Sequence, residues 1–182
     1  MKVTKTAFEG LWILEPKVFN DARGYFYESY SKRTCHEIGL DVEFVQSNQS
    51  LSKKNVIRGL HFQNAPHTQV RLIRVLQGRI LDVVLDLRRD QGTFGKIFSI
   101  ELAAEEKKQL FIPKGFAHGF SVLSDKAEFL YSCDAYYYPA SEGGIHYNDP
   151  ALGINWKLDS DQAIVSEKDL SLPLFSATSF VF

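Results

Sequence analysis

Arg58 and His61 stand inside an otherwise apolar stretch, VIRGLHFQ, where a charge and a titratable ring need a reason. Two other stretches share this character: IPKGFAHGF carries His118, and AEFLYSCDAYYYP carries Tyr131 and Tyr137. Histidine can take up and release protons near neutral pH, and arginine holds anions through several N–H donors. These side chains are therefore candidates for lining a catalytic or anion-binding cavity.

Each of these side chains, taken alone, also has an ordinary structural explanation. Arg58 can pair with a carboxylate at a sheet edge, and His61 and His118 can be hydrogen-bonded histidines of the core. Tyr131 can be a core aromatic, and the run of tyrosines around Tyr137 can be a strand end that reaches water. Three polar intrusions into one apolar core nevertheless favour a lined cavity.

The elements that must position these residues are predicted to be strands. Apolar residues recur mainly at every second position in short runs, the pattern of half-buried strands. Gln69 to Leu76 and Ile80 to Leu87 form a hairpin around Gly78. The other predicted strands are Gly10–Glu15, Gly24–Tyr30, Val42–Ser50, Val56–Gln63, Gly95–Leu102, Gln109–Ile112, Gly119–Leu123 and Glu128–Tyr138. At least eight strands in one domain imply an all-β sandwich or barrel, and their spacing favours a jelly roll.

Two short peripheral helices are also predicted. Ser31 is a possible N-cap and Gly39 a stop signal, which predicts a helix over 31–39. Ser166 precedes Glu167 and predicts a second helical turn, whose length Pro173 limits.

Length and charge restrict the kinds of protein that this chain can be. With 182 residues it fits one compact domain over 1–182. The formal net charge of -1 leaves no basic surplus for binding nucleic acid, so any phosphate must be met by individually placed arginines.

No signal peptide and no membrane-spanning apolar run is seen, so we expect a cytoplasmic protein that does not enter a membrane. Cys35 and Cys133 suit two reduced thiols better than a disulfide framework or a zinc motif.

Motifs along nearly the whole chain follow the order found in one known family. They are DARGYFYES (21–29), QSNQSLSKKNVIRGLHFQ (46–63), TQVRLIRVLQGRILDVVLDLR (68–88), TFG (93–95), QLFIPKGFAHGF (109–120), FLYSCDAYYYP (129–139), EGGIHYNDP (142–150) and SEKD (166–169). In these motifs the chain resembles the dTDP-4-dehydrorhamnose 3,5-epimerase family, a branch of the cupin-like jelly rolls. The resemblance implies an isomerase of dTDP-rhamnose biosynthesis, which supplies precursors of cell-surface polysaccharide and needs no cofactor.

The resemblance also implies a mechanism. The substrate would be dTDP-4-keto-6-deoxy-D-glucose, whose C3 and C5 protons are acidic beside the C4 ketone, and the product dTDP-4-keto-L-rhamnose. His61 would be the base that removes the proton and so forms an enolate. Asp169 would fix the tautomer of the His61 imidazole. Tyr131 would return a proton from the opposite face. A cation near O4 would stabilise the enolate, and here that position holds Arg71.

Substrate binding is likewise implied by the matched motifs. Arg23 and Arg58 match phosphate-binding positions, and Tyr137 matches the residue that stacks on the thymine, with Phe19 as a second candidate. Further matched contacts are Glu28, Gln46, Ser47, Asn48, His118, Glu142 and Lys168. Members of the family are homodimers that exchange N-terminal strands, so we expect Arg23 and Glu28 to act across the dimer. The subunit that supplies Arg58 stays open, because strict alternation puts Arg58 and His61 on opposite faces unless Gly59 forms a bulge.

Arg71 departs from the family, which usually carries lysine there. Arginine keeps the positive charge of lysine, but its planar guanidinium reaches O4 along a different path from an ammonium. Both inversions are expected to persist, and restriction to C3 or C5 alone is the alternative. The sequence does not decide the final deoxysugar or the nucleotide base.

Three other functions remain as alternatives. A metal-dependent cupin is disfavoured because the five histidines, which include His61 and His118, lack metal-ligand spacing. A 3,4-ketoisomerase would act on the same substrate but move the carbonyl, and solvent deuterium exchange separates the two reactions. A sugar-binding jelly roll without enzymatic activity would not need a base opposed by a proton donor.

Overall fold

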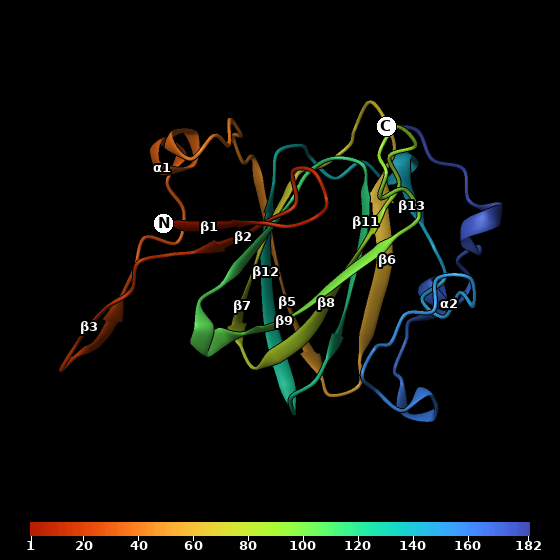
Figure 1. Ribbon diagram of the computed structural model, residues 1–182. Coiled ribbons are helices and arrows are strands. Elements are labelled where there is room, and N and C mark those ends of the chain that lie inside the picture. Colours follow the sequence, from red (N-terminus) through yellow and green to blue (C-terminus); the bar gives the residue numbers. More distant parts are fainter.

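Two antiparallel sheets pack face to face and form the body of the molecule (Figure 1). The computed structural model describes residues 1–182 apart from the side chain of Ser160. The six-stranded sheet has the order β1 (Lys2–Lys5), β2 (Trp12–Glu15), β10 (Gln109–Ile112), β7 (Arg71–Gln77), β12 (Lys126–Cys133) and β5 (Gln46–Lys53). The five-stranded sheet has the order β13 (Glu142–Gly144), β6 (Ile57–Gln63), β11 (Phe116–Val122), β8 (Arg79–Asp86) and β9 (Ile97–Ala103).

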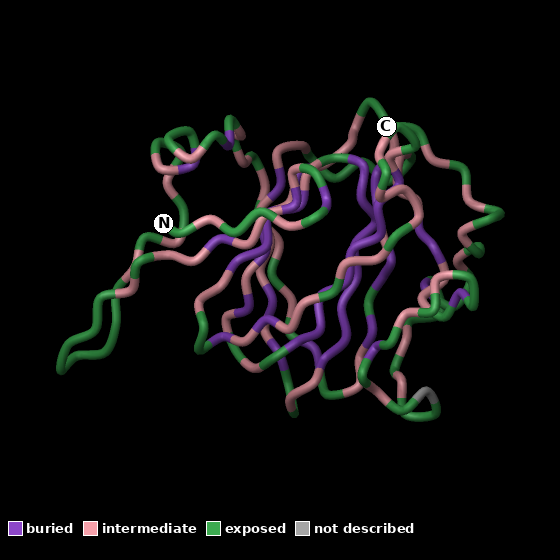
Figure 2. The backbone as a smooth tube through the Cα atoms, in the orientation of Figure 1, coloured by how far each residue is buried: buried purple, intermediate pink, exposed green. Residues whose placement is uncertain are grey.

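The main core lies between the two sheets because alternate residues of each strand point inward. Ile73 and Val75 of β7 meet Phe120 and Val122 of β11 in one buried cluster. Figure 2 shows this burial as continuous along the central strands. Burying these side chains supplies the hydrophobic free energy that holds the sheets together.

The outer face of each sheet is covered by a smaller cluster. Leu60 and Phe62 of β6 pack beneath the C-terminal segment, which contributes Trp156. This segment carries the second helix, α2 (Glu167–Leu170), on the outside of the five-stranded sheet (Figure 1). On the other sheet, Leu72 packs with Cys35 of the first helix, α1 (Lys32–Glu37).

A short hairpin, β3 (Phe19–Asp21) with β4 (Gly24–Phe26), projects from the body on the same side of the molecule as α1 (Figure 1). All residues of both strands are exposed, and the hairpin is green throughout in Figure 2. Its aromatic side chains include Phe19 and Phe26, which are 53% and 71% exposed. Two large apolar side chains thus face solvent on an element with little packing of its own.

Short 3₁₀ helices complete the structure at Ala104–Glu106, Pro139–Ser141, Ser160–Gln162 and Phe175–Ala177. No helix among the described residues is long and apolar enough to cross a membrane. Cys35 and Cys133 are both free and buried.

The predicted strands and helices are largely confirmed. The predicted hairpin around Gly78 is wrong, because β7 and β8 lie in opposite sheets and do not pair with each other. The predicted strand Gly24–Tyr30 ends at Phe26, and the predicted strand Val42–Ser50 begins only at Gln46. Ser31 caps α1 by accepting a hydrogen bond from the Thr34 N–H at 3.3 Å, and Gly39 follows the helix with a φ of 90°. The predicted strand Glu128–Tyr138 is wrong beyond Cys133. The chain bends at Asp134, whose carboxylate accepts a hydrogen bond from the Val70 N–H at 2.7 Å. The strands β1, β3 and β13 were not predicted.

A bulge in β6 puts Arg58 and His61 on the same face. His61 pairs with His118 of β11, whereas Arg58 pairs with Phe120, so one extra residue of β6 lies between the two pairs. Gly59 makes this possible with a φ of 114°, a value that favours glycine. A Cβ on Gly59 would lie 2.6 Å from Gly119 Cα, so the two strands approach too closely for any side chain.

Gly59→Ala should therefore destabilise the protein, whereas Gly92→Ala should not. The disfavoured φ alone costs roughly 1–3 kcal/mol, and the overlap with Gly119 adds to it. Gly92 has nothing within 4 Å of a built Cβ and needs no positive φ, so its variant should stay within about 0.5 kcal/mol of the parent. Urea unfolding measures both free energies. If Gly59→Ala has the same free energy of unfolding as the parent, the bulge does not depend on glycine.

Candidate active site

A cavity of about 720 Å³ opens between the two sheets. Strands β5, β7 and β12 line it from one side and β6 and β11 from the other, with residues around α2 at its edge. The predicted site residues that line it are Gln46, Asn48, Arg58, His61, Arg71, His118, Tyr131, Tyr137, Glu142, Lys168 and Asp169. The fold thus brings together residues from distant parts of the chain.

His61 is bonded to Asp169 within this cavity. His61 Nε2 lies 2.8 Å from Asp169 Oδ1. A carboxylate can only accept in this bond, so Nε2 carries the proton and the lone pair of the neutral ring is on Nδ1. The imidazole side chain is 27% exposed, which leaves it open to the cavity. The pair can therefore act as an oriented base.

Asp169 is ionised although it is only 3% exposed. Burial by itself raises the pKa of Asp169, but hydrogen bonds from His61, from the Gly59 N–H and from Ser166 lower the pKa below its usual value. The Gly59 N–H lies 3.1 Å from Asp169 Oδ2. Ser166 is the N-cap of α2 and fixes the helical turn that carries Asp169.

Tyr131 faces the same cavity from the opposite sheet. It lies on β12, whereas His61 lies on β6. Burial raises the pKa of Tyr131, and the charge of Arg71 offsets part of this rise. The phenol is therefore protonated at neutral pH and able to donate a proton.

Arg71 contacts both His61 and Tyr131. Its guanidinium donates to the His61 carbonyl oxygen at 3.5 Å and lies 5.6 Å from the centre of the Tyr131 ring. Burial lowers the pKa of Arg71, but arginine starts from so high a value that it stays charged at neutral pH. A fixed cation at this position can stabilise negative charge that develops between the two groups.

His118 holds Arg71 from the floor of the cavity. Its Nδ1 lies 3.5 Å from an Arg71 nitrogen, and its Nε2 lies 3.0 Å from Asp82 Oδ2. Asp82 is fully buried, and the sequence analysis missed it. The signal was present, since Asp82 is a charged residue in the apolar run ILDVVLDL just as Arg58 is in VIRGLHFQ.

At the rim of the cavity, Glu142 joins two other predicted contacts. It accepts hydrogen bonds from the Tyr137 hydroxyl at 2.8 Å and from Lys168 Nζ at 2.7 Å. The bond to Glu142 raises the pKa of Lys168. Arg58 also lies at the rim, where its Nε donates to Ser52 at 3.1 Å. Lys168 and Arg58 provide two cations for an anionic ligand.

Four predicted contacts are not brought to the cavity within this chain. Phe19 and Arg23 lie in the projecting hairpin, where Arg23 pairs with Asp21 at 2.6 Å. Glu28 accepts a hydrogen bond from Thr34 of α1. Ser47 lies between the inward Gln46 and Asn48, and its hydroxyl bonds to Ser132 at 2.7 Å instead.

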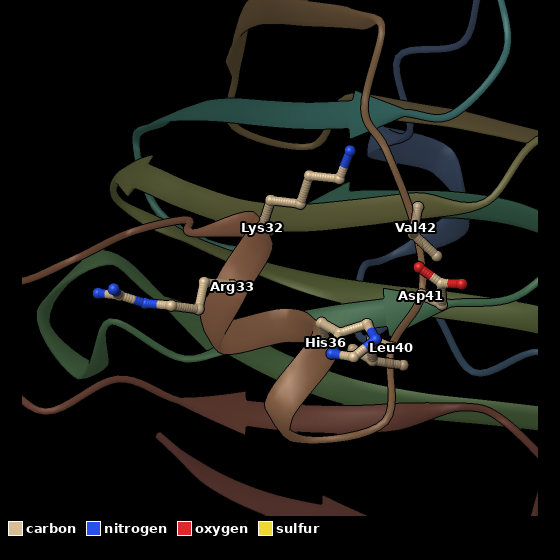
Figure 3. Close-up of a pocket in the computed structure, with 6 residues that line it drawn as sticks. All are labelled: Lys32, Arg33, His36, Leu40, Asp41 and Val42. Carbon is tan, nitrogen blue, oxygen red and sulfur yellow. The ribbon is translucent and has the colours of Figure 1, made fainter.

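A second, smaller cavity of about 430 Å³ lies beside α1 and holds none of the predicted site residues. Its lining residues are Lys32, Arg33, His36, Leu40, Asp41 and Val42 (Figure 3). Arg33 points away from the others, and Lys32 pairs with Glu43 at 3.0 Å. The side chains do not converge on a common point, so we do not assign a ligand to it.

Metal ligands do not cluster anywhere in the described part of the chain: no group of three or more His, Cys, Asp or Glu side chains has the geometry to hold an ion. The prediction that no metal is needed stays a prediction, which metal analysis of active protein would test.

Comparison with known proteins gives one consistent result. The family model described as dTDP-4-dehydrorhamnose 3,5-epimerase matches residues 5–177. The Salmonella typhimurium protein of that name is 52% identical over 175 residues, which cover 96% of this chain and 95% of the relative.

Solved structures give the same result. The crystal structure of the enzyme of that name from Elizabethkingia anophelis has a TM-score of 0.92 at 48% identity, with 97% of each chain covered. The Legionella pneumophila dTDP-6-deoxy-D-glucose-3,5-epimerase, in complex with dTDP-4-keto-L-rhamnose, has a TM-score of 0.93 at 45% identity, covering 98% of this chain and 94% of that chain. The prediction of an all-β, cupin-like jelly roll is confirmed. The chain belongs to the dTDP-4-dehydrorhamnose 3,5-epimerase family.

Proposed function

We propose that this protein is an epimerase that inverts C3 and C5 of dTDP-4-keto-6-deoxy-D-glucose to give dTDP-4-keto-L-rhamnose. One observation carries the proposal: His61 and Tyr131 line a single cavity from opposite sheets, and Arg71 lines the same cavity against the Tyr131 ring. A sugar ring held in that cavity would have a base on one face and an acid on the other. Inversion requires this arrangement, because the proton must leave and return on opposite faces.

In the proposed reaction, Nδ1 of His61 takes the proton from the carbon beside the C4 ketone, and the electron pair moves onto O4. Arg71 stabilises the resulting enolate, and Asp169 stabilises the imidazolium. The Tyr131 hydroxyl then gives its proton to the same carbon from the other face. The tyrosinate regains a proton and His61 loses one before the second carbon reacts. Each inversion therefore leaves the substrate's composition unchanged.

The nucleotide would bind at the rim. Arg58 and Lys168 supply positive charge for the diphosphate, and the Tyr137 ring is available for stacking on the base. Gln46, Asn48, His118 and Glu142 supply polar groups around the sugar.

A homodimer would bring the remaining contacts to the site. Phe19, Arg23 and Glu28 lie on or beside an exposed hairpin whose strands pair only with each other in the described chain. We propose that it reaches the cavity of a second copy with exchange of N-terminal strands. A monomer mass in analytical ultracentrifugation would contradict this dimer.

Ser47 would contact substrate only through its main chain. The two free thiols support a cytoplasmic location.

Solvent exchange tests the reaction directly. Incubation of dTDP-4-keto-6-deoxyglucose with the enzyme in deuterated water should place deuterium at both C3 and C5, observed by NMR. Deuterium at only one carbon would instead indicate a single-centre epimerase. Movement of the carbonyl group from C4 to C3 would indicate a 3,4-ketoisomerase. Label at neither carbon would refute epimerisation and leave a sugar-binding jelly roll.

His61→Asn and Tyr131→Phe should each retain dTDP binding and lose proton exchange by roughly 100- to 10,000-fold, because each removes a group that moves a proton. His36→Asn and Tyr136→Phe are matched controls. His36 lies on the exposed side of α1, and Tyr136 is 70% exposed. Parent-like exchange in either test variant would remove that residue from the mechanism.

Arg71 is tested by a pair of variants. Arg71→Met removes the cation and should slow exchange at both carbons by roughly 100- to 1,000-fold. Arg71→Lys keeps the charge and should stay within about tenfold of the parent, with label still at C3 and C5. The NMR assay of deuterium incorporation measures exchange for both variants. If Arg71→Met exchanges as fast as the parent, Arg71 does not stabilise the enolate.

A further inference from the structure

The turn that carries Tyr137 is held by side chains instead of strand pairing. Strand β12 ends at Cys133, and the backbone of Tyr136–Tyr138 lies outside both sheets. Two glutamines bind it. Gln46 Oε1 accepts the Tyr137 N–H at 3.0 Å, and Gln63 Oε1 accepts the Tyr138 N–H at 2.7 Å.

Gln63 uses both ends of its amide. Its Nε2 donates to the His67 carbonyl at 2.6 Å and to the Tyr136 carbonyl at 3.3 Å, while its Oε1 accepts from Tyr138. The side chain therefore binds the backbone on both sides of Tyr137. Since Gln63 is only 3% exposed, water cannot replace these bonds if the amide is lost.

His67 adds a second contact to the same turn. Its ring stacks on Tyr138 with centroids 4.0 Å apart and planes at 21°. Because Gln63 also binds the His67 carbonyl, one amide ties together the loop after β6 and the turn after β12. Gln63 of β6 thus holds the Tyr137 backbone on both sides, and Gln46 of β5 holds its N–H.

Gln63 and His61 lie two residues apart on β6, so they share a strand face. The proposed base and the clamp on the Tyr137 turn therefore project from the same strand. This places the aromatic ring at the rim at a set distance from the imidazole deeper in the cavity.

We propose that Gln63 is a positioning residue for the nucleotide subsite: its buried amide orients the Tyr136–Tyr138 turn so that Tyr137 can stack on the base. The inference rests on the proposed function, in which Tyr137 contacts the nucleotide. Gln63 acts through Tyr137 and takes no part in proton transfer.

Gln63→Met is the principal test, because methionine has a similar length and volume but makes none of the three bonds. The dissociation constant for dTDP should rise about tenfold, and KM for the dTDP-sugar should rise with it, while kcat stays within about threefold. Gln77→Met is the matched control. Gln77 is the exposed last residue of β7, outside the cavity, and its variant should bind as the parent does.

A double-mutant cycle separates positioning from a direct contact. If Gln63 acts through Tyr137, then Gln63→Met combined with Tyr137→Ala should bind dTDP no more than about twofold more weakly than Tyr137→Ala alone. Fully additive losses would overturn the inference, and so would parent-like binding by Gln63→Met. Parent-like binding by Tyr137→Ala would instead refute the stacking role in the proposed function.

Gln63→Glu provides a second variant in case Gln63→Met does not fold. It keeps the acceptor for Tyr138 but turns a carboxylate oxygen toward the two carbonyls, so dTDP binding should weaken by a similar factor. Binding equal to the parent would count against the clamp. Failure of both variants to fold would also overturn the inference, since Gln63 would then be a determinant of folding.

Discussion

The carboxylate of Asp169 is the interaction on which the rest of the site depends. One oxygen bonds to the His61 ring and the other to the Gly59 N–H, so a single group joins the proposed base, the bulge of β6 and the C-terminal helix α2. The bulge in turn lets Arg58 and His61 share a face. Loss of this carboxylate would have two effects at once. The Gly59 N–H would be left unpaired, and nothing would fix the tautomer of the His61 imidazole.

The polar groups of the cavity are linked by hydrogen bonds inside a β sandwich. Arg71 lies against His118, which lies against the buried Asp82, and His61 lies against Asp169. Such groups are costly to bury, and hydrogen bonds to their neighbours offset part of that cost. The same low-dielectric setting strengthens the attraction between a fixed guanidinium and an enolate. The buried polar groups that are costly for the fold are therefore the same groups that the proposed enolate chemistry needs.

The outer parts of the site are built differently from its floor. The floor is formed by inward side chains of paired strands, whereas the rim depends on a turn bound by two glutamines and on the Glu142–Lys168 pair. The projecting hairpin has little packing of its own. In the proposed dimer, rigid strands would position the reacting carbon, and the turn and the partner hairpin would hold the nucleotide.

The sequence by itself determined the all-β architecture, both helices and most of the residues around the cavity. Alternation and capping are local patterns, so Ser31, Ser166 and the strand runs could be read from neighbouring residues. Motif resemblance named His61, Tyr131 and Asp169 without explaining how they meet.

Only the tertiary structure decided which of these side chains meet and how. The bulge at Gly59, the buried partner Asp82, the end of β12 at Cys133 and the clamp of Gln63 all depend on contacts between residues far apart in the chain. No local pattern encodes such contacts, because a hydrogen bond between distant residues forms only after the strands have paired and the sheets have packed.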